Sequence, residues 1–119
     1  NWYHSGGDEL VYEVGLKWEL EHLGYSVRRQ EEFPVYYKCE KTEIKRRQDL
    51  VVETPSIGNI ILELKALHYV EDKHRLQLQS YLRLTNTQYG MLINFGTDKV
   101  YTEIWEYNSE TNKCSRVVV

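Results

Sequence analysis

Apolar residues recur with two spacings along this chain, and the spacing divides it into helices and strands. Over residues 8–23 and 71–84 the apolar positions follow the repeat of an amphipathic helix. The other apolar stretches are short, rich in β-branched and aromatic residues, and bounded by turn residues. They predict strands at 25–37, 44–52, 59–66, 89–95, 100–107 and 114–119. The order is helix, three strands, helix, strand and a C-terminal hairpin, and we expect one domain over residues 1–119.

Some strands have a predictable place in the sheet. Pro34 cannot donate a hydrogen bond to a neighbouring strand, so residues 25–37 form either an edge strand or two short strands. Residues 89–95 are almost continuously apolar, which is typical of a central strand. We expect residues 38–43 to form the turn after the first strand. Residues 53–59 form the next turn, so the second and third strands pair as an antiparallel hairpin.

The first predicted helix carries charged residues along one side. This polar stripe repeats every four residues and consists of Glu9, Glu13, Lys17 and Glu21. Apolar surface on the same helix comes from Leu10, Val11, Val14, Trp18 and Leu23. Ser5 is expected to cap the start of the helix, and Gly24 its end. From this pattern alone, Glu9 is a solvated carboxylate.

The third predicted strand combines the pattern of a buried strand with two charges. Residues 60–66 are apolar except for Glu63 and Lys65, whose side chains share one face because side chains alternate along a strand. Buried Glu and Lys are rare unless they are paired. Asp49 stands at the head of the apolar run on the preceding strand. Two carboxylates and one ammonium group around one point can hold a divalent metal ion and an attacking water.

One face of the second predicted helix mixes polar and apolar side chains. His74, Gln77, Leu78 and Tyr81 follow the helical repeat. Leu78 and Tyr81 indicate that this face is turned inward. His74 and Gln77 then either point toward the same site or lie at the edge of the apolar stripe, satisfied by backbone groups. The pattern slightly favours the edge.

Composition narrows the class of protein. The 119 residues are 41% hydrophobic and 28% charged, as in globular domains, and no apolar run is long enough to cross a membrane. No signal-peptide pattern opens the sequence. A net charge of −3 argues against a strongly basic nucleic-acid coat but is compatible with a nuclease, whose metal ligands are acidic. Cys39 and Cys114 match no zinc motif and are expected to be free thiols in a reducing, intracellular compartment.

Several motifs resemble, in their order along the chain, those of a known enzyme family. They are Gly6-x-x-Glu9-x-x-Tyr12, Asp49, Glu63-Leu64-Lys65 and His74-x-x-Gln77-x-x-x-Tyr81. Together they resemble the GxxExxY family of the PD-(D/E)xK nuclease superfamily. The flanking segments 34–37 and 92–96 are similar as well. The resemblance implies an α/β fold with a restriction-endonuclease-like αβββαβ core, in which helices flank a mixed β-sheet, followed here by a C-terminal β-hairpin.

The resemblance also implies metal-dependent cleavage of phosphodiester bonds, with Mg²⁺ as the usual ion and Mn²⁺ as an alternative. By this resemblance Asp49 and Glu63 would bind the metal, and Lys65 would position or activate the water. Glu9 would add a further carboxylate to the metal site from the first helix, and Gln77 would orient the site from the second. Carboxylates crowded into a metal-free site repel one another, so at least one is expected to have a raised pKa.

Two functions are compatible with these residues. The first is an active nuclease, with nucleic acid as its partner and DNA favoured over RNA. The second is a catalytically silent module that binds nucleic acid or a partner protein. Candidate substrate contacts are Lys45, Arg46, Arg47, His74 and Tyr81, with Arg28 and Arg29 as further cations. Tyr81 would also pack beneath the site, and the cations have a solvated strand face as their alternative role. The sequence leaves open whether the chain acts alone, as a homodimer or in a larger assembly.

Overall fold

The helices and strands follow the predicted order. The computed structural model describes residues 6–118, apart from the side chains of residues 8, 31, 36, 37 and 44–48. Its elements are α1 (Gly6–His22), β1 (Ser26–Tyr37), β2 (Glu40–Thr54), β3 (Gly58–Lys65), α2 (Asp72–Thr85), β4 (Tyr89–Asn94), β5 (Tyr101–Asn108) and β6 (Lys113–Val117). Within this part of the chain, neither helix has the length and apolar character needed to cross a membrane. The predicted cap residue Ser5 lies outside the described residues.

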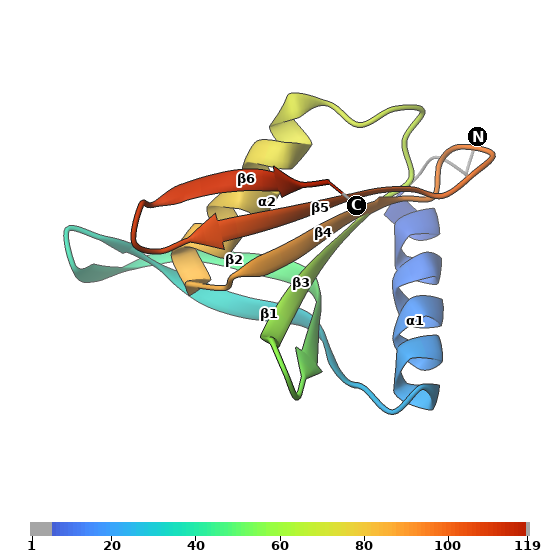
Figure 1. The fold of residues 1–119 in the computed structure, drawn as a ribbon, viewed down its shortest axis with the longest axis horizontal. Coiled ribbons are helices and arrows are strands. Elements are labelled where there is room, and N and C mark those ends of the chain that lie inside the picture. Colours follow the sequence, from blue (N-terminus) through green and yellow to red (C-terminus); the bar gives the residue numbers. More distant parts are fainter. Residues whose placement is uncertain (1–5, 119) are drawn as a thin grey trace.

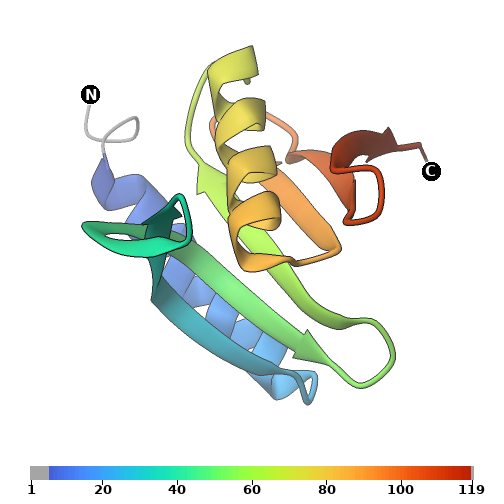
Figure 2. The same ribbon diagram turned by 90° about the vertical axis from the view of Figure 1, so that its left-hand side faces the viewer.

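A mixed sheet of six strands, in the order β1-β2-β3-β4-β5-β6, forms the centre of the structure. Strands β3 and β4 are parallel, and the other neighbours are antiparallel. α2 supplies the crossover that a parallel pair requires. The two helices cover opposite faces of the sheet (Figure 1, Figure 2). The predicted αβββαβ core with a C-terminal hairpin is therefore confirmed, with β1 at the edge and β4 inside the sheet.

Apolar clusters hold the two helices against the sheet. The cluster on the α1 face includes Val27, Leu50, Val52, Leu62, Leu64 and Ile93, with Leu16 and Leu20 packed against it. The cluster on the α2 face includes Phe33, Ile61, Leu78, Tyr81, Leu82 and Leu92. Leu62 and Leu64 fall in the first cluster and Ile61 in the second, as alternation along β3 requires. Glu63 therefore shares the α2 face of the sheet with Ile61.

The apolar surface predicted for α1 does not face the core. The exposed residues of this surface are Leu10, Val11, Val14, Trp18 and Leu23. Leu16 and Leu20 make the core contacts instead. The polar stripe is not wholly solvated either. Glu13 is only 4% exposed, and Glu9, which the pattern alone indicated to be solvated, accepts a hydrogen bond from Ala66 N. The helix is rotated so that Glu9 and Glu13 face the sheet, and this rotation leaves most of its apolar side chains outside.

The hairpin between β1 and β2 has a shorter turn than the predicted residues 38–43. Lys38 and Cys39 have positive φ values of 48° and 64°, as in a two-residue type I′ turn. This turn closes the hairpin at once, so the polar residues from Glu40 onward pair with β1 instead of forming a loop.

Cys39 and Cys114 are both free thiols, as predicted.

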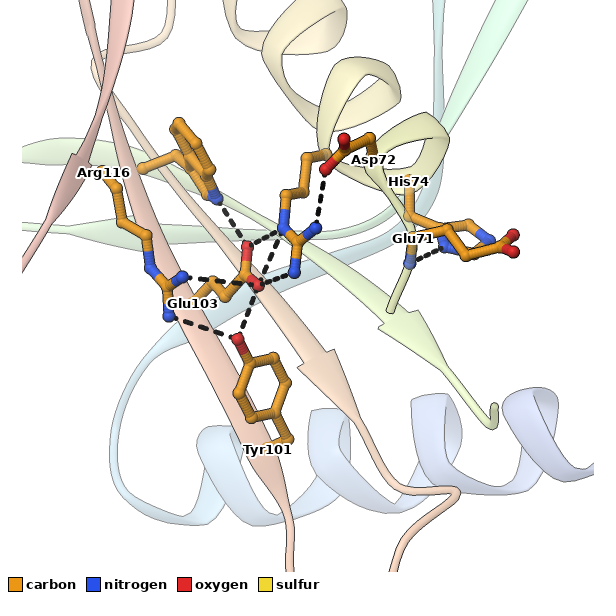
Figure 3. Close-up of polar contacts among 8 residues, drawn as sticks. Glu71, Asp72, His74, Tyr101, Glu103 and Arg116 are labelled. Carbon is orange, nitrogen blue, oxygen red and sulfur yellow. Dashed lines mark hydrogen bonds and ion pairs between the residues drawn. The ribbon is translucent and has the colours of Figure 1, made fainter. Parts of the chain in front are cut away.

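Local signals mark one end of each helix. Gly24 follows α1 with a φ of +97°, and its N–H donates to the carbonyl of Glu21 at 3.0 Å, as expected for a glycine cap. At the start of α2, the backbone N–H of Glu71 donates to Nδ1 of His74 at 3.0 Å (Figure 3). His74 thus uses this nitrogen to cap its own helix, which is the backbone-satisfied alternative considered from the sequence.

The segment that follows β3 is fixed to the end of β4. Asn94 is buried, its Oδ1 accepts a hydrogen bond from Leu67 N (2.8 Å), and its Nδ2 donates to Leu67 O (2.9 Å). Gly96 touches the same segment so closely that a Cβ at this position would lie 2.2 Å from both Leu67 N and Leu67 O. The close approach of two backbones therefore requires glycine at residue 96.

We expect Gly96→Ala to lower the free energy of unfolding by at least about 1–3 kcal/mol, because added atoms in a closely packed place force the backbone to shift. Gly15→Ala is the matched control, since nothing lies within 4 Å of its added Cβ. Alanine favours a helix over glycine, so this control should gain up to about 1 kcal/mol. Urea denaturation followed by circular dichroism measures both changes. Equal stability of the two variants would contradict the close approach.

Candidate active site

The sheet forks where β2 leaves β3. The ladder between these strands stops at the pair Leu50–Leu62, whereas β2 continues to pair with β1 as far as Glu40. Figure 1 shows the β1–β2 hairpin extending beyond the rest of the sheet. Past Leu62, one edge of β3 therefore has no strand neighbour, and its N–H groups need other acceptors.

Two carboxylates take the place of the missing strand neighbour. Leu64 N donates to Oδ2 of Asp49 at 2.9 Å, and Ala66 N donates to Oε2 of Glu9 at 3.1 Å. Amides two residues apart on one strand edge are separated by about 6.6 Å. The carboxylates of β2 and α1 are therefore attached to β3 on the two sides of Lys65.

Glu63 is a further carboxylate at the fork, and it is buried. Continuing the β2–β3 register by one residue places Asp49 opposite Glu63, and side chains opposite each other share a face of the sheet. Glu63 is 3% exposed, and its Oε1 has no hydrogen-bond partner among the described residues. A buried carboxylate oxygen of this kind is rare in proteins and indicates a place for a proton or a cation.

Burial and crowding raise the pKa of both strand carboxylates. For Glu63, burial is the main cause and the charge of Asp49 the next, so that its pKa lies well above the usual 4.5. For Asp49, burial again raises the pKa, and the hydrogen bond from Leu64 N and the charge of Lys65 offset this only in part. Carboxylates with such raised pKa values are concentrated at functional sites.

A cavity of about 160 Å³ opens beside these groups. Its lining residues are Glu9, Leu10, Glu13, Gln30, Asp49 and Lys65. Glu9, Asp49 and Lys65 were singled out from the sequence, and the cavity brings them together. Glu63 is not a lining residue and lies within the sheet, opposite Asp49. The arrangement is a small acidic cavity with one ammonium group in its wall.

Glu13 and Gln30 are site residues that were not predicted. Oε2 of Glu13 accepts hydrogen bonds from Nε of Arg29 (2.8 Å) and Nε2 of Gln30 (3.1 Å). The spacing of four residues from Glu9 is the sequence signal that places Glu13 on the same side of α1. Nothing in the residue type of Gln30 indicates its position at the cavity.

Gln30 has an unusual backbone for a residue inside a strand. Its φ of +52° lies in the left-handed region, which non-glycine residues adopt at a cost of about 1–3 kcal/mol. The β1–β2 register on both sides places Gln30 opposite Asp49, and the ladder skips this pair. The irregularity of β1 thus lies directly beside a predicted metal ligand. Residues held in such a strained backbone conformation are concentrated at active sites and ligand sites.

Comparison with known proteins agrees with this geometry. The family model for the PD-(D/E)XK nuclease superfamily matches residues 3–106. The chain belongs to this superfamily. The crystal structure of SSO0001 is similar, with a TM-score of 0.62 and 21% sequence identity. The match covers 79% of this chain and 48% of that one, so this chain spans about half the length of SSO0001, and at this identity the likeness concerns the fold. No curated protein matches the chain.

The donor atoms of the candidate site fit a divalent ion such as Mg²⁺. They are hard carboxylate oxygens, and Oε1 of Glu63 is free to serve as one of them. In the described part of the chain, no group of three or more His, Cys, Asp or Glu side chains is arranged to hold a metal ion. Mg²⁺ is commonly held by one or two carboxylates together with water and substrate phosphates, so a pair such as Asp49 and Glu63 would meet this requirement. Glu9, the further ligand predicted, has its Oε2 engaged by Ala66 N.

The predicted site residues on α2, His74, Gln77 and Tyr81, are not among the residues that line the cavity. Gln77 is exposed, and its Nε2 donates to the hydroxyl of Tyr81 at 2.8 Å. Tyr81 is buried and packs edge-on against Phe33, with ring centroids 5.4 Å apart. The pKa of His74 is lowered, first by burial and then by the charge of Lys65. Gln77 lies at the edge of the apolar stripe and reaches the α2 cluster through Tyr81.

The predicted cationic contacts of this PD-(D/E)XK chain occupy β1 and β2. Those on β2 are Lys45, Arg46 and Arg47, and their side chains lie outside the described part of the structure. On β1, Arg28 forms an ion pair with Glu53, and Arg29 forms one with Glu13 at 2.8 Å. Both β1 arginines thus neutralise carboxylates of the protein, and the partner of Arg29, Glu13, lines the candidate site.

Proposed function

We propose that this protein is a divalent-metal-dependent nuclease of the GxxExxY family, with Mg²⁺ as its ion and DNA favoured as its substrate. The observation that carries the proposal is Oε1 of Glu63, which is buried opposite Asp49 and has no partner among the described residues. Two carboxylates side by side, of which Glu63 is buried and Asp49 half-buried, repel each other, and a bound divalent cation removes this repulsion. Asp49 and Glu63 are therefore the proposed metal ligands.

The other residues of the cavity have roles in positioning. A bound Mg²⁺ would supply a water of lowered pKa and would stabilise charge on the phosphate. Lys65 lines the cavity, and its ammonium group would orient the water and donate to a phosphate oxygen. Asp49 and Glu9 hold the backbone amides on both sides of Lys65, so the side chain of Lys65 extends from a fixed backbone.

A cleavage assay tests the proposed activity. The protein is incubated with single- and double-stranded DNA and RNA in the presence of Mg²⁺, Mn²⁺ or EDTA. We expect cleavage with either metal, none in EDTA, and faster cleavage of DNA than of RNA. Cleavage in EDTA would contradict the role of the metal, and intact substrates under every condition would contradict the nuclease.

Lys65→Ala is expected to reduce cleavage by about 10²–10³-fold, the effect of removing an electrostatic stabiliser of the transition state. The variant should fold and bind Mn²⁺, because Lys65 is not a metal ligand. Lys113→Ala, which changes an exposed lysine on β6, is the matched control and should cleave like the parent. Calorimetric titration with Mn²⁺ and thermal melting separate the outcomes. If Lys65→Ala is unfolded or no longer binds Mn²⁺, the lysine supports the structure rather than the reaction.

The second candidate function is a catalytically silent module that binds nucleic acid or a partner protein. It is favoured by the net charge of −3, which offers little general attraction for the phosphates of nucleic acid. The two functions differ in one outcome of the cleavage assay. A silent module retains labelled nucleic acid in Mg²⁺ and leaves it intact, whereas the proposed nuclease converts it to shorter products.

A further inference from the structure

A second, larger cavity lies at the ends of the parallel strands β3 and β4. Its volume of about 600 Å³ is within the range of ligand sites in proteins. Its walls include His68, Tyr69, Arg75, Asn94, Lys99 and Tyr101. The carboxyl ends of parallel strands are a preferred place for ligands in α/β folds. None of the cleavage chemistry described above uses this cavity.

The cavity shares a wall with the candidate active site. Asn94, which lines the cavity, pairs with Lys65 in the parallel β3–β4 ladder. Neighbouring strands are about 4.8 Å apart, so the cavity begins one strand away from Lys65. The segment between the two is held from both sides, by Glu9 at Ala66 N and by Asn94 at Leu67. If a phosphate of the substrate binds at Lys65, the adjoining nucleotide would lie against this fixed segment, and its base could reach the cavity.

Flat side chains line the cavity. Tyr69 is 69% exposed. The hydroxyl of Tyr101 donates to Oε2 of Glu103 at 2.7 Å, which fixes the Tyr101 ring (Figure 3). The guanidinium group of Arg75 is held by both carboxylate oxygens of Glu103, at 2.9 Å from Nε to each. Aromatic rings and guanidinium planes are the surfaces on which unpaired bases stack.

The charges around the cavity favour stacking over phosphate binding. Lys99 stands next to Asp98, and Glu103 neutralises Arg75, so these lining residues offer little net positive charge. Proteins that hold a duplex depend on many contacts between cations and phosphates. Bases within a duplex are also stacked on both sides already, and extruding one costs a few kcal/mol. The cavity is therefore suited to a base that is unpaired before it binds.

We propose that this cavity binds an unpaired base of the nucleic acid whose phosphate lies at Lys65, and that the substrate is single-stranded at this point. The proposal rests on the proposed nuclease function and adds a substrate class to it. Tyr69 is the stacking residue in this proposal. Its exposure makes it the simplest position to test, because removal of an exposed ring leaves the core intact.

Binding is measured by fluorescence anisotropy in Ca²⁺, which takes oxygen ligands as Mg²⁺ does. A gel run afterwards checks that the probe is intact. The probes are a labelled oligothymidylate, its duplex with oligoadenylate, and a sugar-phosphate strand of equal length without bases. Tyr69→Ala should bind oligothymidylate at least about fivefold more weakly than the parent, as expected for loss of one stacking contact. Tyr69→Phe, which keeps the ring, should bind like the parent. Tyr25→Ala is the matched control, since Tyr25 is 41% exposed and follows the far end of α1.

The strand without bases separates stacking from other effects. The parent should bind it more weakly than oligothymidylate, and Tyr69→Ala should not weaken its binding further. Equal losses on both strands, or a parent that prefers the duplex, would overturn the base-binding site. If binding depends on the bases but the protein never cleaves in Mg²⁺, the proposed nuclease function is wrong and the proposed base-binding site is supported. If the protein cleaves in Mg²⁺ but Tyr69→Ala does not weaken binding of oligothymidylate, the base-binding site is wrong and the nuclease function is supported.

Discussion

Glu63→Gln and Asp49→Asn are each expected to abolish metal-dependent cleavage and to stabilise the metal-free protein. Cleavage should fall by at least about 10²-fold, because the metal contributes several kcal/mol to stabilisation of the transition state. Stability should rise because each substitution removes one of two crowded charges, and burial has raised the pKa of both carboxyl groups. Removing one partner of a structural, buried ion pair has the opposite effect and costs about 3–5 kcal/mol.

The gain in stability for Glu63→Gln should depend on pH. The pKa of Glu63 is raised in the folded protein, so the folded state binds this proton more tightly than the unfolded chain. Its contribution to stability therefore falls as the pH rises from about 4.5 toward the raised pKa. Glutamine does not titrate, so the difference between variant and parent should be small below pH 4.5 and should grow above it.

Thermal melting in EDTA over a series of pH values measures this difference, beside a cleavage assay in Mg²⁺. Glu110→Gln, in an exposed turn, is the matched control and should change neither the melting temperature nor cleavage. If Glu63→Gln and Asp49→Asn both melt well below the parent, and the parent never cleaves, the carboxylates hold the fold together. The silent-module hypothesis would then replace the nuclease.

Glu103→Ala is expected to lower the free energy of unfolding by about 3–5 kcal/mol, the typical cost of removing one partner of a buried ion pair. The Glu103 side chain is 0% exposed and accepts hydrogen bonds from Nη2 of Arg75 (2.7 Å), from Tyr101 and from Nε1 of Trp105 (3.0 Å). Figure 3 shows these contacts converging on Glu103. Asp72→Asn is the matched control, because Asp72 bonds the same Arg75 but is 91% exposed. It should cost less than about 1 kcal/mol.

The same ion pair predicts an acid-sensitive part of the stability. Burial by itself raises the pKa of Glu103, but the hydrogen bonds from Arg75, Tyr101 and Trp105 outweigh it and hold the pKa at about 2. A carboxylate whose pKa is lowered on folding stabilises the protein above its unfolded pKa, and this contribution is lost as the pH falls. The parent should therefore lose stability between pH 4.5 and 2, and Glu103→Ala should lack this part of the loss. Urea denaturation across this range measures it, and equal slopes would contradict the role of Glu103.

Features set by local periodicity could be predicted from the sequence. Glu63 and Lys65 share a strand face because side chains alternate, and the hairpin that brings Asp49 beside them follows from a turn signal. The rotation of α1 could not be predicted, because it depends on which side of the helix meets the fork of the sheet. The pattern therefore placed Glu13 beside Glu9 in a polar stripe and did not indicate that Glu13 is buried.

Features that join distant segments had no signal of their own. Glu103 and Arg75 are 28 residues apart, and their contact depends on how α2 packs across β5. The alternating pattern of the last hairpin did not predict this contact, because alternation shows which face a side chain lies on but not which residue it contacts. The backbone of Gln30 is another such feature, since glutamine is not a residue that marks turns or left-handed positions.

The left-handed backbone of Gln30 is expected to set thermal stability against the proposed cleavage activity during evolution. Glycine adopts this conformation without strain, so Gln30→Gly should be among the substitutions that stabilise the chain. The same change removes the amide that binds Glu13 and loosens the backbone opposite Asp49. Random variants sorted by melting temperature should accumulate glycine at residue 30, whereas variants sorted by cleavage should keep glutamine. Selection for thermal stability and selection for cleavage rate are thus expected to favour different residues at this position.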